Sequence, residues 1–263
     1  MTTKKLIACF DVIGDRVTKA IKFQDNIDVA SAVDMARILS EAQIDEIVFF
    51  DIMASAEKRQ IDIATVRNVA KHITVPLIVG GGIRNVADMR DAINAGADKV
   101  SVDSMAVRNP DIISEGAKEL GSKAIVLSTQ VLRTPNDERF PSGYEVYIDG
   151  ARTATGLDAI EWIKRGVELG AGEICINSID RDGTLSGYDL DLMKISEKAV
   201  SVPLIASGGA GEPVHLYDLF SQTTAQSAII SSMLYSPRLP RNYPVHEIKG
   251  YLLEKGIDVT PIQ

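Results

Sequence analysis

The second half of the chain repeats the first, and this repeat constrains the fold more than any other feature of the sequence. The segment VPLIVGGGI at residues 75–83 matches VPLIASGGAG at residues 202–211, an offset of 127 positions. The match continues where ADKVSVDSM (97–105) corresponds to AQSAIISSM (225–233). Self-similarity on this scale indicates two copies of one structural unit. We therefore predict one domain, residues 1–263, built from two similar halves at about 1–122 and 123–263.

The repeat also includes the first strand-like segment of each half. IACFDV at residues 7–12 pairs with VLSTQV at residues 126–131, 119 positions later. This alignment makes Gln130 the counterpart of Asp11. The two halves therefore differ at this position, where one has a carboxylate and the other an amide.

Short apolar runs alternate with longer amphipathic segments along the whole chain. Runs such as IVFF and SAIIS are continuously apolar, which is typical of parallel strands covered on both faces. The predicted strands lie near residues 5–11, 46–51, 76–79, 99–103, 124–130, 173–178, 203–206 and 227–231. Eight strands, each followed by a helix, predict an α/β fold of the (β/α)8 TIM barrel type. In that fold the active site lies in the loops after the strands.

Helix boundaries are marked by capping residues. In RNPDIISEGAKELGS we predict Asn109 as the N-cap, Pro110 as the first helical residue and Gly121 just past the end. Two segments, 12–29 and 132–154, are too long for simple connections. The second is expected to form a hairpin. Both follow strands, so each is either a cover for the active site or a surface loop without function.

Composition excludes several classes of protein. A formal net charge of −8 disfavours binding to nucleic acid or to an anionic membrane. No apolar run approaches the roughly 18 to 20 residues that cross a bilayer, and the apolar run near the N-terminus is too short for a signal peptide, so we expect a cytosolic protein. Cys9 and Cys175 lie in apolar strands and are expected to be buried and reduced. No metal or cofactor is expected.

Glycine turns and hydroxyl residues occur at equivalent places in the two halves. Glycines follow the third and seventh predicted strands, at 80–83 and 207–211. Asp103 and Ser104 follow the fourth strand, and Ser231 and Ser232 follow the eighth. Glycines let backbone N–H groups approach an anion, and hydroxyls at a helix start complete a phosphate site. Two such sites predict a ligand with a phosphate at each end.

The segments IACFDV, FFDIMAS, VPLIVGGGIR, AGADKVSVDS, GAGEICINSIDRDGTLSGYD and VPLIASGGAG together closely resemble the cyclase subunits of imidazole glycerol phosphate synthase. The resemblance covers essentially the whole chain. It implies a role in histidine biosynthesis. The implied substrate is the bisphosphorylated ribulosyl aminoimidazole carboxamide ribonucleotide, which is converted with ammonia to imidazole glycerol phosphate and the aminoimidazole carboxamide ribonucleotide. It also implies a glutaminase subunit as partner in a heterodimer.

The resemblance assigns roles to individual residues. Asp11 falls on the family's first catalytic aspartate, and Gln130 falls on the second. The implied substrate and phosphate contacts are Lys19, Asp51, Gly82, Asp103, Ser104, Asp182, Gly183, Gly209, Ser231 and Ser232. The implied charged ring at the ammonia entrance is Lys5, Glu46, Lys99 and Glu173.

Two of these positions depart from the family pattern. Gln130 replaces an aspartate, and an amide cannot exchange a proton near neutral pH. Loss of a general acid or base costs roughly 10² to 10⁴ in rate, about 3 to 5 kcal/mol. Asp103 replaces an asparagine beside a phosphate. A carboxylate there is repelled by about 4 kcal/mol at about 4 Å unless it turns away, is protonated or meets Lys19.

These departures leave two alternatives to a cyclase. One is a barrel that binds a bisphosphate or the glutaminase without turnover. The other keeps the ammonia channel but serves the amidation of a surface sugar. The paired phosphate sites argue against the second alternative, because a nucleotide-sugar acceptor does not need two terminal phosphate sites.

Overall fold

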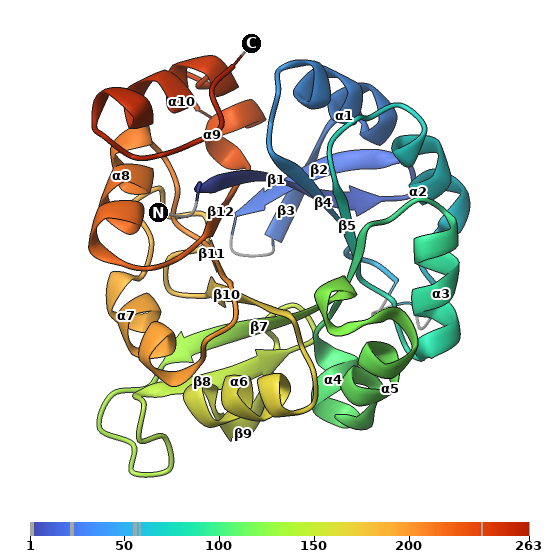
Figure 1. The fold of residues 1–263 in the computed structure, drawn as a ribbon, viewed down its shortest axis with the longest axis vertical. Coiled ribbons are helices and arrows are strands. Elements are labelled where there is room, and N and C mark those ends of the chain that lie inside the picture. The colour runs from blue at the N-terminus through green and yellow to red at the C-terminus, as the bar shows by residue number, and fades with distance from the viewer. Residues whose placement is uncertain (1–2, 22–23, 55–56, 58, 238, 263) are drawn as a thin grey trace.

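The structure is a computed structural model that describes residues 3–262 except 22–23, 55–56, 58 and 238. Among the described residues, eight parallel strands form a closed ring and the helices lie around its outside (Figure 1). The last strand of the ring pairs with the first. In order round the ring the strands are β1 (Lys5–Ile13), β4 (Glu46–Asp51), β5 (Leu77–Gly80), β6 (Lys99–Val102), β7 (Ile125–Arg133), β10 (Glu173–Ser178), β11 (Leu204–Ser207) and β12 (Ser227–Ile230). The predicted (β/α)8 barrel is confirmed.

The helices pack their apolar faces against the outer surface of the ring. The longer ones are α1 (Ala32–Glu41), α2 (Ile63–Ala70), α3 (Val86–Asn94), α5 (Asp111–Leu120), α6 (Ala159–Glu168), α7 (Leu190–Ala199), α8 (Pro213–Gln222) and α10 (Val245–Glu254). The short ones are α4 (Ser104–Arg108), α9 (Ser232–Tyr235) and the 3-10 turn η1 (Ser122–Ala124). None of the described helices has the length and apolar character that crossing a membrane requires.

Alternation along the strands divides the core into two parts. On β1, Leu6, Ala8 and Phe10 face the helices, while Ile7 and Cys9 face the inside of the ring. The inner cluster is small and mostly aliphatic, and it consists of Ile7, Cys9, Val48, Ile78, Val126, Cys175, Ile205 and Ile229. The prediction that both cysteines are buried and reduced is confirmed.

One helix start was predicted one residue too early. Helix α5 has Pro110 as its N-cap, whereas Asn109 is the C-cap of the short helix α4 and donates its N–H to Met105 O at 2.8 Å. Asn109 therefore ends one helix and does not begin the next. The predicted end is confirmed, because Gly121 follows α5 with φ of +86°.

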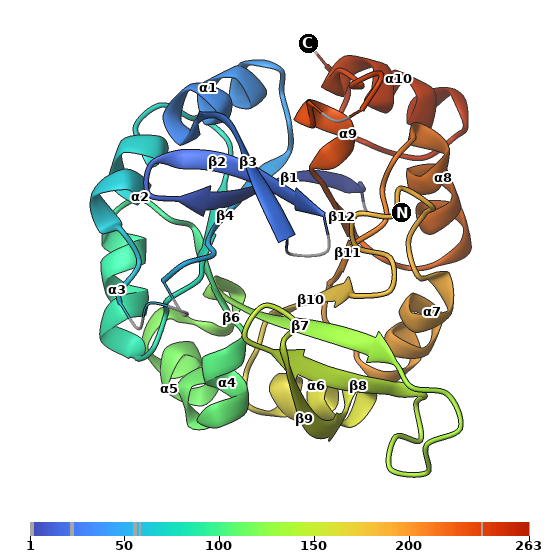
Figure 2. The same ribbon diagram turned by 180° about the vertical axis from the view of Figure 1, so that it is seen from behind.

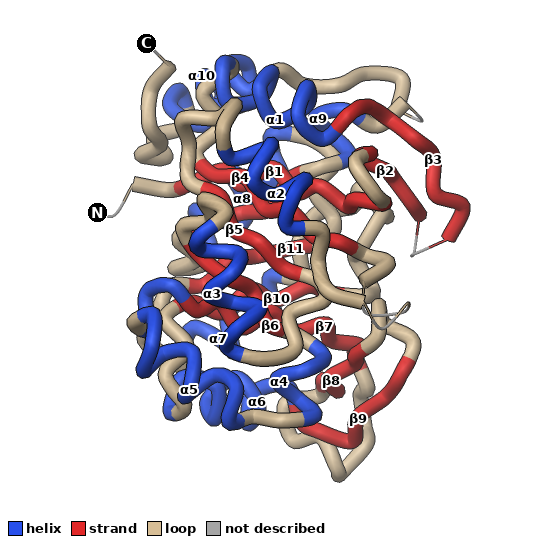
Figure 3. Tube along the Cα trace, turned by 90° about the vertical axis from the view of Figure 1, so that its right-hand side faces the viewer, coloured by secondary structure: helices blue, strands red, loops and turns tan. Residues whose placement is uncertain are grey.

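Two hairpins extend the ring at one end. Segment 12–29, predicted as a loop, instead forms strands β2 (Arg16–Ile21) and β3 (Gln24–Ser31), which continue antiparallel from β1. The predicted hairpin after β7 is confirmed as β8 (Tyr144–Ile148) and β9 (Thr153–Asp158). Figure 3 shows both hairpins at the end of the barrel away from the N-terminus, and Figure 2 shows them in front of the ring. This end is the barrel mouth, where the strands point.

Candidate active site

A cavity of about 770 Å³ opens at the barrel mouth and extends into the ring as far as Cys9 and Cys175. Its walls include every residue that the sequence analysis assigned to catalysis or substrate binding. They are Asp11, Lys19, Asp51, Gly82, Asp103, Ser104, Gln130, Asp182, Gly183, Gly209, Ser231 and Ser232. The fold therefore brings residues from both halves of the sequence to one site.

Asp11 and Lys19 form an ion pair on one side of the mouth. Strand β2 folds back on β1 so that Thr18 lies opposite Asp11, and the next residue, Lys19, reaches into the cavity. Lys19 Nζ lies 3.5 Å from Asp11 Oδ2 and donates to Ser231 Oγ at 2.8 Å. Burial is the largest single effect and acts to lower the pKa of Lys19, but Asp11, Cys9 and Asp182 together outweigh it and the pKa is raised. A buried cation therefore joins the end of β1 to the loop after β12.

Asp103 and Gln130 face each other on the other side of the mouth. Asp103 follows β6 and Gln130 lies in the neighbouring strand β7, and Gln130 Nε2 donates to Asp103 Oδ2 at 2.8 Å. Burial raises the pKa of Asp103 to about 7, and the hydrogen bond from Gln130 only partly opposes this effect. Lys19 pairs with Asp11 and Ser231, and within the described chain it forms no ion pair with Asp103. Asp103 is instead a carboxyl group that holds a proton near neutral pH.

The two glycine turns adopt the same unusual backbone conformation. Gly81 and Gly82 have φ of +82° and +71°, and the repeat-related Gly208 and Gly209 have φ of +92° and +104°. A Cβ at Gly209 would collide with the carbonyl oxygen of Gly187. Only glycine fits this conformation and spacing without strain. Both turns lie on the cavity wall, as the predicted phosphate sites require.

Three arginines that line the cavity were not predicted from the sequence. They are Arg84, Arg108 and Arg152. Arg108 forms an ion pair of 2.6 Å with Asp149, whose backbone N–H donates to Ser104 Oγ at 2.9 Å. The turn between β8 and β9 thus docks on the start of α4. The signal that could have indicated Arg108 is its position four residues after Ser104, on the same face of a helix.

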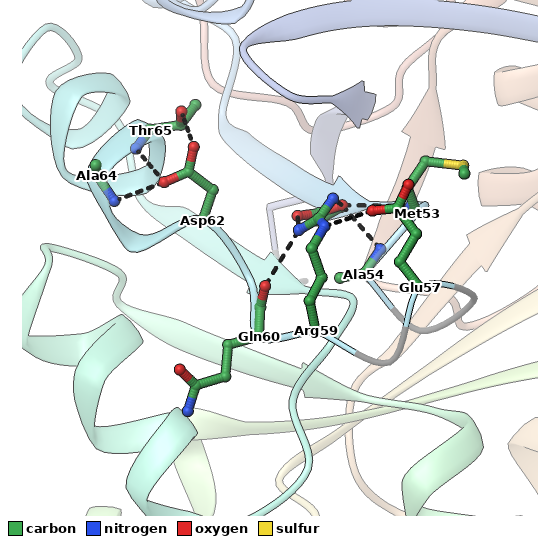
Figure 4. A network of polar contacts seen from close by, with 9 residues as sticks. Met53, Ala54, Glu57, Arg59, Gln60, Asp62, Ala64 and Thr65 are labelled. Atoms are coloured by element: carbon green, nitrogen blue, oxygen red, sulfur yellow. Dashed lines mark hydrogen bonds and ion pairs between the residues drawn. The ribbon is translucent and has the colours of Figure 1, made fainter.

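Asp51 is occupied by contacts within the protein. The side chain is 2% exposed and accepts two hydrogen bonds from Arg59, at 2.6 and 2.9 Å. It also accepts from the backbone N–H groups of Met53 and Ala54. Figure 4 shows Arg59 at the centre of this network, where it also contacts Glu57. Asp51 therefore anchors Met53, Ala54 and Arg59, which follow β4, and it also lines the cavity.

A chain of ion pairs lies at the opposite end of the ring. Lys5 Nζ lies 3.0 Å from Glu46, and Lys99 Nζ lies 3.1 Å from Glu46 and 2.8 Å from Glu173. Burial acts to lower the pKa of Lys99, but the carboxylates of Glu173 and Glu46 raise it overall. The four predicted ring residues are thus joined in one row of ion pairs, and the apolar inner cluster lies inside the same barrel.

Comparison with known proteins gives consistent matches. A family model described as "Histidine biosynthesis protein" matches residues 5–240. The proteins named "Imidazole glycerol phosphate synthase subunit HisF" from Desulfosudis oleivorans and Solidesulfovibrio magneticus are 49% and 46% identical to this chain. The matches cover 98% of both chains and 100% of both chains, respectively. A protein of the same name from Oleidesulfovibrio alaskensis is 52% identical over 89% of this chain and 91% of its own length.

Proposed function

The chain belongs to the histidine biosynthesis protein family, and on this premise we propose that it is the cyclase subunit of an imidazole glycerol phosphate synthase. The observation that carries the proposal is the single cavity, which gathers two glycine turns, the hydroxyls that follow them and two carboxyl groups. A substrate with a phosphate at each end spans such a site. The non-catalytic and sugar-amidating alternatives are not favoured.

In the proposed reaction the two phosphates fix the substrate across the mouth. One phosphate binds at Gly82 and Ser104, and the other binds at Gly183, Gly209, Ser231 and Ser232. Backbone N–H groups and hydroxyls supply donors, and Lys19 supplies positive charge near the second site. Holding the substrate at both ends places its central ketose over the opening of the ring, beside Asp11.

Ammonia in this proposal comes from a glutaminase subunit that docks at the ring of Lys5, Glu46, Lys99 and Glu173. The aliphatic inner cluster lies inside the same barrel. Uncharged ammonia passes an apolar lumen at far lower cost than the ammonium ion, because burial of an unpaired charge is expensive. At the mouth, ammonia adds to the ketose carbonyl and Asp11 moves the protons of that addition.

The test is turnover of the bisphosphorylated substrate by the isolated chain with excess ammonium and no glutaminase. We expect imidazole glycerol phosphate and the aminoimidazole carboxamide ribonucleotide in equal amounts. Adding a glutaminase subunit should make turnover dependent on glutamine. Substrate binding without any product in either assay contradicts the proposal. The half-barrel boundaries and the cytoplasmic location remain predictions.

A further inference from the structure

The carboxyl group that position 130 lacks is present on the neighbouring strand. Gln130 is the repeat-related counterpart of Asp11, and it is hydrogen-bonded to Asp103 at the end of β6. We propose that Asp103 is a second proton-transferring catalytic residue of this site, opposite Asp11, and that Gln130 positions it. This inference rests on the proposed cyclase function and names a residue for its second proton transfer.

Geometry supports this role first. Asp103 lines the same cavity as Asp11 and lies one strand away from position 130, so its carboxyl reaches the same part of the mouth. The bond from Gln130 uses Oδ2. Within the described chain, Oδ1 accepts no hydrogen bond, and it is the oxygen available to a ligand.

The surroundings of Asp103 favour the protonated form of its carboxyl group. Asp149 acts to raise the pKa of Asp103 and Arg108 acts to lower it, but both effects are smaller than that of burial. Arg108 is itself paired with Asp149 at 2.6 Å. Arg84 is paired with Asp88, and Arg152 lines the same cavity. A phosphate bound at the adjacent site adds negative charge, which raises the pKa further.

Other titratable groups face Asp103 from across the cavity. They are Asp11 and Lys19 on β1 and β2, Asp182 after β10, and Cys175 inside the ring. Lys19 is committed to Asp11 and Ser231. Asp182 and Cys175 have raised pKa values, mainly because of burial, so the thiol is neutral at physiological pH. None of these groups supplies Asp103 with a fixed cation.

Gln130 can support both protonation states of Asp103. Its Nε2 donates to the carboxylate, as observed, while its Oε1 is buried without a hydrogen-bond partner. A half-turn of the amide presents Oε1 to a protonated Asp103, which can then donate to it. An aspartate at position 130 has no N–H to donate and would compete with Asp103 for one proton.

The proposed step uses the protonated form of Asp103. After ammonia has replaced the ketose oxygen, which leaves as water, the new nitrogen forms a bond to the amidine carbon. The bond from that carbon to the nitrogen of the aminoimidazole carboxamide breaks, and its electron pair goes to the leaving nitrogen. Asp103 gives its proton to that nitrogen, and Asp11 accepts the proton lost by the nitrogen that enters the new ring. Asp103 thus loses one proton while Asp11 gains one. Proton exchange with water then returns Asp103 to its protonated form and Asp11 to its carboxylate form. No oxidation or reduction occurs.

A set of exchange variants tests the proposal in the ammonium-dependent assay. Asp103→Asn should lower kcat by roughly 10² to 10⁴. It should leave binding of inorganic phosphate unchanged well below pH 7, where Asp103 is protonated, and tighten it well above pH 7, where the carboxylate of the parent repels the anion. The double variant Asp103→Asn with Gln130→Asp moves the acid by one strand and should recover kcat to within about tenfold of the parent. Asp98→Asn removes a carboxylate at the other end of β6, where it accepts from Leu77 N–H, and should leave kcat unchanged.

The outcomes separate this inference from the proposed function. If the parent turns over and Asp103→Asn keeps kcat within about threefold, the role of Asp103 is wrong while the cyclase function stands. If the parent gives no product, both ideas fail. A ¹³C NMR titration of the Asp103 carboxyl, assigned by its loss in Asp103→Asn, provides a readout independent of turnover. If the pKa of Asp103 in the phosphate-bound protein is near its ordinary value, Asp103 is not protonated near neutral pH and the proposal is wrong.

The role of Gln130 has its own test. Gln130→Leu keeps Asp103 but removes a donor to its carboxylate, so the pKa of Asp103 should rise further. Because the proposed acid must be protonated, the alkaline decline of kcat should move to higher pH in this variant. Gln130→Asn, which keeps an amide, should restore part of the original profile. An unchanged profile in Gln130→Leu shows that Gln130 does not position Asp103.

Discussion

The two sides of the barrel mouth each carry a carboxyl group, but they control its charge in different ways. Asp11 has a lysine ammonium at 3.5 Å, and that lysine also donates to Ser231 after the neighbouring strand β12. Asp103 has an amide at 2.8 Å and no ion pair within the described chain. An ion pair fixes a charge over a wide pH range, whereas a buried carboxyl beside an amide gains or loses its proton near neutrality. The site therefore combines an ion-paired carboxylate, Asp11, with a carboxyl group, Asp103, that can exchange a proton near neutral pH.

The largest effect is expected from removing the carboxylate with the fixed charge. Asp11→Asn should lower ammonium-dependent kcat by roughly 10² to 10⁴, because the asparagine cannot accept a proton. The measurement is product formation at saturating substrate and ammonium. Asp15→Asn, an exposed position in the turn of the same hairpin, serves as the control and should keep the rate of the parent.

Equal rates in Asp11→Asn and the parent would remove the distinction between the two sides. In that case Asp103 alone would carry the proton transfers. A combined Asp11→Asn and Asp103→Asn variant then decides whether any carboxyl at the mouth is required.

The next largest effect is expected from removing the cation beside Asp11, so that Asp11, like Asp103, has no ion pair. Lys19→Met leaves Asp11 without its cation in a partly buried position. Since removing one partner of a buried ion pair costs about 3 to 5 kcal/mol, and Asp11 retains some access to water, we expect a loss of about 2 to 3 kcal/mol in the free energy of unfolding at pH 7. Urea unfolding measures this loss.

Arg16→Met is the matched control for Lys19→Met. Arg16 lies on the same strand, β2, and its ion pair with Asp28 is exposed to solvent. Exposed ion pairs contribute little, so stability should hardly change. If both variants lose the same stability, the cation beside Asp11 is no more important than a surface charge.

A smaller effect follows from the pKa of Asp103. A folded-state pKa of about 7, above the ordinary 3.8, means that the folded protein binds more protons than the unfolded chain between these two values. Stability therefore falls as pH rises through this window. Asp103→Asn removes that penalty, and its free energy of unfolding relative to the parent should increase by about 2 kcal/mol from pH 5 to pH 8. This figure is about half of the free energy that corresponds to the full pKa shift of Asp103, because the carboxyl group faces the solvent-filled mouth and is partly screened.

Asp62 provides a control of opposite sign. It caps helix α2 by accepting from the N–H groups of Ala64 and Thr65, and hydrogen bonds from Thr65 and Ala64 hold its pKa below the ordinary value despite the opposing effect of burial. Its stabilising contribution is present above pH 4 and is lost below it. Asp62→Asn should therefore show no gain from pH 5 to pH 8. The same gain in both variants would contradict the assignment to Asp103.

The barrel and the glycine turns were predictable because they depend on patterns in the sequence, whereas roles such as that of Asp11 came from the resemblance to a family. Continuous apolar runs identified all eight strands of the ring to within about three residues at each end. The repeat identified the glycine turns, whose positive φ values exclude other residues. A strand order that follows the chain then places both sets of loops around one mouth.

The contacts within the site could not be predicted in the same way. Gln130 and Asp103 are 27 residues apart, and each was interpreted alone as a loss of function. Their hydrogen bond depends on the adjacency of β6 and β7 and on two side-chain conformations that no periodicity encodes. The pairing of Asp51 with Arg59 was missed for the same reason, because Arg59 lies in an irregular loop. Segment 12–29 was interpreted as a loop because its strands carry mostly polar residues.

The smallest effect compares the two phosphate sites directly. Ser104→Ala and Ser232→Ala each remove one hydroxyl beside a glycine turn, and a hydrogen bond of about 1 kcal/mol corresponds to about a fivefold loss in affinity for inorganic phosphate. Ser104 also accepts from the backbone of Asp149 and so holds the β8–β9 turn. Ser104→Ala should therefore increase amide hydrogen exchange in that turn, whereas Ser232→Ala should not. Equal exchange in both variants would contradict the role of Ser104 in holding the β8–β9 turn.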